Sequence, residues 1–185
     1  MIDRINPRAR RDDYGSKINR SHSPLRAFGL PVATILLGSL TPLLPIIASA
    51  PLLPPMGYIL FIAWRLARPG LFPLWAGIPF GAFDDLFSGQ PFGSAIMLWS
   101  LTMLAVELIE TRFPWRSFWQ DWGVAVLLLA AYLLLGAFVA GVEAHPARLV
   151  LLIPQFMLAI IAFPIVSLMV ASVDRFRLRR VRRVG

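Results

Sequence analysis

Cysteine is absent from this chain of 185 residues, and charged side chains make up only 15% of it. Without cysteine, neither disulfide bonds nor thiolate chemistry is possible. A soluble domain of this length is usually about 25% charged. The shortage of charge therefore argues against a soluble globular protein.

The residues that usually carry catalysis are also scarce. Only two histidines occur, and neither His22 nor His145 has neighbours at a spacing that suits a metal ion. No serine-hydrolase, zinc-protease or phosphate-loop motif is present in the sequence. We therefore predict that the protein is not an enzyme and expect no catalytic residues, no metal site and no cofactor.

Apolar residues dominate instead, with 57% hydrophobic residues and a mean hydropathy of +0.68. A bilayer core of ~30 Å is crossed by about 20 apolar residues in a helix. The apolar stretches predict six spans, at about 28–48, 52–64, 71–87, 92–109, 123–142 and 149–173. The second span is short and starts in the proline-rich PLLPP segment, so we expect it to be tilted or partly non-helical. The predicted fold class is an all-α polytopic membrane protein with about six transmembrane helices in one domain, 27–173.

Positive charge predicts the orientation of these spans. Of the 18 lysines and arginines, 17 fall in the tails 1–26 and 174–185 or in the segments 65–69 and 110–122. Because positive residues are retained on the cytoplasmic side, both termini are expected to be cytoplasmic. The basic C-terminal tail is expected to face anionic lipid, not nucleic acid. Its arginines are Arg175, Arg177, Arg179, Arg180, Arg182 and Arg183.

Two features mark the predicted cytoplasmic face. Aromatic residues between 115 and 122 recur at helical spacing, which fits either a short helix lying in the headgroup layer or an aromatic belt at two helix ends. Glu107 and Glu110 close the fourth span, and we expect them to form a charge cluster in which Arg65 is a possible partner.

The segment GIPFGAFDDLFSGQPFG carries small and acidic residues every four positions. The repeated positions are Gly77, Gly81, Asp85, Gly89 and Gly93. Two glycines four residues apart in a helix allow a second helix to approach closely. We therefore expect Gly77 and Gly81 to pack against protein, and Asp85 to share that face.

The two adjacent acids of this segment are expected to differ in environment. Asp85 lies just before a polar turn, so backbone N–H groups around 89–93 are within its reach. It either holds a tight hairpin together or binds a partner or ligand, since acids inside membranes are functional candidates. Asp84 is rotated by ~100° from it around the helix. We expect Asp84 to be wetted at the membrane interface.

The stretch from Gly81 to Gly93 resembles the bacterial rod shape-determining protein MreD family. Its GAFDDLFSGQPFG fits the pattern of glycine, three residues, aspartate, an apolar pair and Ser-Gly, with Asp85 at the acidic position, and a further glycine follows at Gly93. The RLARPG segment before it and a last span with Pro164 and a basic tail also fit. Asp84 departs from the pattern, which is usually apolar there, and the long basic N-terminal tail lies outside it.

The resemblance implies a non-enzymatic, multi-pass subunit of the cell-elongation complex in the bacterial inner membrane. Such a subunit binds MreC, and through MreC it is linked to MreB filaments and the sidewall peptidoglycan synthases that control cell shape. The family is also distantly similar to the substrate-binding membrane subunits of vitamin transporters, which provides an alternative function. A small-molecule pocket needs several polar groups that face one another. The spans contain few polar groups, namely Asp85, Glu107, Gln155 and some hydroxyls, so the sequence argues weakly against this alternative.

Overall fold

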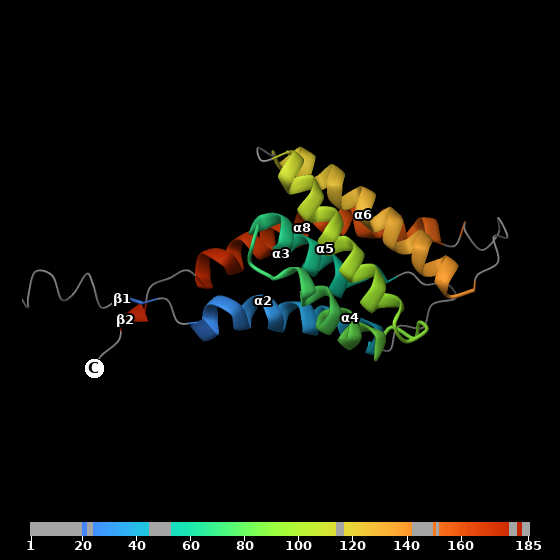
Figure 1. Cartoon of the computed structure of the whole chain (residues 1–185), viewed down its shortest axis with the longest axis horizontal. Helices are drawn as coiled ribbons and strands as arrows, with labels where there is room; N and C mark the ends of the chain where they lie inside the picture. Colours follow the sequence, from blue (N-terminus) through green and yellow to red (C-terminus); the bar gives the residue numbers. More distant parts are fainter. Residues whose placement is uncertain are drawn as a thin grey trace, which may run out of the picture.

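The structure is a computed structural model that describes residues 20–21, 24–44, 53–113, 117–141, 150, 152–177 and 181–182. Within these residues the protein is all-helical, apart from one pair of two-residue strands (Figure 1). The α-helices are α2 (Pro24–Ser39), α3 (Met56–Ala67), α4 (Gly77–Asp85), α5 (Ser94–Arg112), α6 (Phe118–Val139) and α8 (Leu152–Arg177). A 3-10 turn, η1 (Thr41–Leu43), follows α2, and a second one, η2 (Leu74–Ala76), directly precedes α4.

Three helices, α5, α6 and α8, are long and apolar enough to cross a membrane. The helix within the predicted third span is much shorter than expected. Residues 71–87 were predicted to form one span, but α4 has nine residues and is preceded by the η2 turn. Pro73 lies in extended conformation directly before η2, so regular helix begins only after it. At ~1.5 Å per residue, α4 spans only about half of a bilayer core.

The helix α3 is the centre of the bundle. All ten residues from Gly57 to Leu66 are buried, which is typical of a helix that is enclosed on every side. Its side chains reach several neighbours: the Trp64 indole donates to the Thr34 hydroxyl of α2, and the Tyr58 hydroxyl bonds Thr102 of α5. Figure 1 shows α3 between α2, α5 and α8. As expected, the residues directly before α3, 53–55, are non-helical.

Successive helices run antiparallel, so the bundle has two distinct ends. The C-terminal ends of α3, α5 and α8 meet, because Arg65 contacts Glu110 and Arg68 contacts Asp174. We call this the basic end. The C-terminal ends of α2, α4 and α6 lie at the opposite end, which we call the cavity end. Strands β1 (Arg20–Ser21) and β2 (Val181–Arg182) pair antiparallel and bring the two tails together.

The aromatic segment at 115–122 does not form a separate short helix in the described residues. Helix α6 begins at Phe118 and continues without interruption to Val139, so Trp119 and Trp122 lie in its first turns. Ser117 and Gln120 form a capping box that starts the long helix at this point. Of the two interpretations, a separate short helix over 118–122 is therefore wrong, and the aromatic belt stays a prediction. Trp115 lies outside the described residues.

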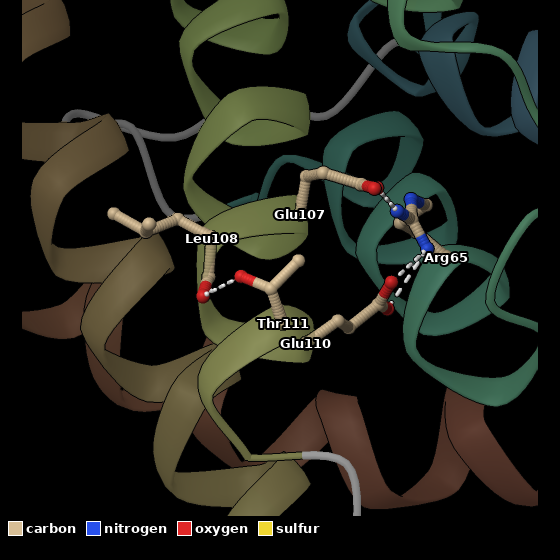
Figure 2. Close-up of polar contacts among 5 residues, drawn as sticks. All are labelled: Arg65, Glu107, Leu108, Glu110 and Thr111. Carbon is tan, nitrogen blue, oxygen red and sulfur yellow. Dashed lines mark hydrogen bonds and ion pairs between the residues drawn. The ribbon is translucent and has the colours of Figure 1, made fainter.

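The predicted charge cluster at the end of α5 is confirmed, with Arg65 as its centre. Arg65 is only 1% exposed, and its guanidinium donates hydrogen bonds to both oxygens of Glu110 at 2.8 Å. A third bond of 2.6 Å joins it to Glu107 (Figure 2). A buried charge needs such partners, because an unpaired one is costly to remove from water. The three residues therefore lock the end of α3 to the end of α5.

We predict that Arg65→Leu destabilises the bundle strongly. Breaking a buried ion pair from one side costs roughly 3–5 kcal/mol, because a charge stays buried without its partner. The Glu107 side chain is 47% exposed and can rehydrate, so the loss should lie near about 3 kcal/mol. The measurement is the free energy of unfolding in detergent. The control is Arg112→Leu, at the exposed last residue of α5. This change should alter the free energy of unfolding by less than about 0.5 kcal/mol.

Candidate functional site

Helices α4 and α5 form a hairpin in which the two backbones touch. A Cβ atom added at Gly81 would lie 2.6 Å from the Ala95 carbonyl oxygen, and one at Gly77 would lie 2.8 Å from the Ser100 backbone. Neither distance leaves room for a side chain. The glycines thus provide the close helix packing that their four-residue spacing predicted.

The Asp85 carboxylate caps the start of α5. It is 6% exposed, and it accepts hydrogen bonds from the N–H of Gly93 at 2.8 Å and of Ala95 at 2.9 Å. Longer bonds from the Ile96 N–H and the Ser94 hydroxyl complete its shell. The first N–H groups of a helix lack partners within the helix, so this carboxylate satisfies donors that would otherwise be buried unpaired. Of the two roles predicted for Asp85, the structure therefore shows the first: its carboxylate holds the hairpin together. Both of its oxygens accept hydrogen bonds from the start of α5.

The turn between the helices depends on glycine at two positions. Gly89 has φ of 68° and Gly93 has φ of 99°, which is left-handed backbone that favours residues without a Cβ. Gly93 is also the residue directly before α5, and its N–H is one of the donors to Asp85. The last two glycines of the repeat thus shape the turn, whereas the first two pack helices.

Asp84 does not lie in a wet interface, so that expectation is wrong. It is only 8% exposed, because α2 and α6 cover the side of α4 that carries it. Asp84 lines one cavity together with Ser39 of α2 and Tyr132 of α6. The two adjacent acids thus belong to different environments, as the helical rotation predicted, but both environments are interior.

Asp84 borders a cavity of about 430 Å³ at the cavity end of the bundle. The walls come from the ends of α2, α4 and α6, the starts of α3 and α8, and the turn after α4. The polar side chains that line it are Ser39, Thr41, Asp84, Ser88, Gln90, Tyr132 and Gln155. Sequence reasoning noted Gln155 as one of the few polar groups in a span but did not bring these residues together. These residues come from distant parts of the chain. The only sequence signal that could have indicated them is that each is a polar residue within an apolar stretch.

The basic tail departs from its predicted role at one position. Arg177 was expected to face lipid, but it is 6% exposed, bonds Asp174 at 2.7 Å and lies 5.4 Å from the centre of the Trp64 ring. Helix α8 extends to this residue and turns its side chain onto α3. Arg175 is exposed, and Arg182 pairs through its backbone in β2, whereas Arg179, Arg180 and Arg183 lie outside the described residues.

No family model, no curated protein and no solved structure matches this chain. The resemblance to the MreD family therefore depends on the residues of the α4–α5 hairpin and the segments around it. Within the part of the chain that the structure describes, no three histidine, aspartate or glutamate side chains gather closely enough to hold a metal ion.

We predict that Asp85→Leu is far more destabilising than Asp84→Asn. The first change leaves the N–H groups of Gly93 and Ala95 without an acceptor, at about 1–3 kcal/mol for each buried donor. The second change keeps the side chain's shape and removes only its charge. Thermal unfolding of the purified protein and the yield of folded protein measure the difference. A larger loss for Asp84→Asn would show that the cap on α5 is not the main contribution.

Proposed function

We propose that the protein is a non-enzymatic inner-membrane subunit of the bacterial cell-elongation machinery, which binds MreC and supports sidewall peptidoglycan synthesis. Through MreC it would be linked to MreB filaments and the peptidoglycan synthases. The observation that carries the proposal is the hairpin from Gly81 to Gly93. Four residues by which this segment resembles the MreD pattern have distinct physical roles: close packing at Gly81, capping by Asp85, and left-handed backbone at Gly89 and Gly93.

We propose further that α2, α3, α4, α5, α6 and α8 form six membrane passages with both termini in the cytoplasm. The alternating direction of the helices supports this topology, and so does the pairing of the two tails through β1 and β2. The arginines at the basic end fit a cytoplasmic position, because positive residues are retained there. The short helix α3 fits because neighbouring helices surround it, so protein covers its backbone.

Reporter fusions test this topology. A reporter that is active only in the cytoplasm should be active when fused after Arg68 or Gly185 and silent after Gln90 or His145. The reason is that Arg68 lies at the basic end, which is proposed to face the cytoplasm, whereas Gln90 lies at the opposite, cavity end. Activity at Gln90 would place the hairpin turn in the cytoplasm and rule out six passages in this order.

A scaffold subunit needs an outer surface that meets its partner. On α5 the side chains of Leu101, Leu104 and Leu108 are 48–67% exposed, next to the hairpin that carries the resemblance. Side chains on α8 such as Ile165 and Leu168 are equally exposed and apolar. Both surfaces suit contact with lipid or with a transmembrane helix of a partner. The reason is that these side chains are apolar, so covering them would not bury a polar group.

We predict that tryptophan substitutions on the exposed face of α5 release MreC. Purified gently from native membranes, the wild-type protein should carry MreC with it. At least one of Leu101→Trp, Leu104→Trp and Leu108→Trp should lower the recovered MreC about tenfold at normal protein abundance, because a bulky ring prevents close helix contact. The matched control is Ile165→Trp on α8. Cells with the releasing variant should lose their rod shape.

A failure to recover MreC with the wild-type protein would contradict the proposal. The alternative function, a substrate-binding subunit of a vitamin-type transporter, is favoured by one observation, the polar cavity at the end of the bundle. In that case a deletion strain should regain normal growth and shape when the missing nutrient is supplied. A scaffold cannot be replaced in this way.

A further inference from the structure

The cavity end of the bundle holds a carboxylate that has no positively charged partner among the described residues. Asp84 is 8% exposed, yet no lysine, arginine or histidine among the described residues pairs with it or lines the cavity. By contrast, buried Arg65 at the other end has two carboxylate partners. A buried charge is normally paired, because its loss of hydration is otherwise uncompensated. Among the described residues, Asp84 therefore has no positive group that compensates its charge, and a cation bound in the cavity would supply one.

Two hydroxyls at the same cavity are also buried without a hydrogen bond in the described part of the chain. They are the Oγ atoms of Ser39 and Ser88. Ser39 is 2% exposed and lines the cavity together with Asp84, and its hydroxyl has no hydrogen-bond partner among the described residues. Buried hydroxyls in folded proteins nearly always have a partner. Both side chains line the cavity, so its contents are the partner available to them.

The dimensions of the cavity fit a small molecule. Its volume of about 430 Å³ lies within the range of roughly 300–1,000 Å³ that is usual for ligand pockets. Gln90, Tyr132 and Gln155 add further donors and acceptors around Asp84. An ammonium group offers three donors and a positive charge, which matches a carboxylate surrounded by hydroxyl and amide oxygens.

We propose that this cavity is a binding site for a small polar molecule with a protonated amine, in which the ammonium group binds Asp84 and the hydroxyls of Ser39 and Tyr132. Ser88 and the amides of Gln90 and Gln155 contact the rest of the molecule. This site lies inside the bundle and does not depend on MreC. It gives Asp84, the position at which the chain departs from the MreD pattern, a role of its own.

The test compares two molecules of equal length, 1,5-diaminopentane and 1,5-pentanediol, on the full-length protein in detergent. The diamine should raise the midpoint of thermal unfolding by several degrees in a saturable manner, and the uncharged diol should leave it unchanged. Asp84→Asn should weaken the apparent affinity for the diamine at least tenfold, because a neutral amide does not attract the ammonium charge.

A second variant pair keeps the test decisive if Asp84→Asn folds poorly. Gly136 lines the cavity, and a Cβ atom there would meet its nearest neighbours at an ordinary 3.7 Å. Gly136→Ala should therefore bind the diamine normally, whereas Gly136→Leu should fill the cavity and abolish binding. Equal shifts with diamine and diol, no shift with either, or diamine binding that persists in Gly136→Leu would overturn the proposal.

The outcome is independent of the proposed function. MreC should copurify equally with wild-type protein and with Gly136→Leu. Loss of diamine binding with MreC retained in this variant is the expected result. Failure of the wild-type protein to bring down MreC, together with saturable diamine binding that Gly136→Leu abolishes, would reject the scaffold function and keep the site.

Discussion

The cap that Asp85 places on the start of α5 is the interaction on which the rest of the hairpin depends. It lets α4 end and α5 begin within a few residues, with the buried N–H groups of the new helix satisfied. The contact of the two backbones at Gly81 follows from this short connection. With α4 held in this orientation, its neighbouring acid, Asp84, can only point toward α2 and α6. One carboxylate thus fixes the geometry, and the other is positioned by it.

The two ends of the bundle treat buried charge in opposite ways. At the basic end, Arg65 and Arg68 meet acidic side chains of α5 and α8 at 2.6–2.8 Å. Arg65, the buried positive group there, thus has its negative partners within the chain. At the cavity end, Asp84 and two hydroxyls surround an open volume. A bundle built only for stability would gain from apolar side chains in their place, so the polar cavity points to a role beyond folding.

Local spacing in the sequence was enough to predict the hairpin but not the cavity. Gly77, Gly81 and Asp85 lie within one helical segment, where the distance along the chain determines which face they share. Asp84 and Arg177 were misjudged because the residues that bury them, on α2, α6 and α3, lie far away in sequence. The length of α4 was overestimated for a related reason. An apolar stretch does not distinguish one continuous helix from a short helix that is preceded by a turn.

The two proposals use different faces of the same hairpin. Contact with a partner helix requires the outer face of α5, where Leu104 and Leu108 are exposed. Binding of an ammonium group requires the inner face of α4, where Asp84 lines the cavity with Ser39 and Tyr132. Because Gly81 and the Asp85 cap join the helices through their backbones, a side chain can change on either face without moving the other helix. The outer face and the cavity are therefore separable, and a substitution that abolishes both functions at once would have to act on the hairpin itself.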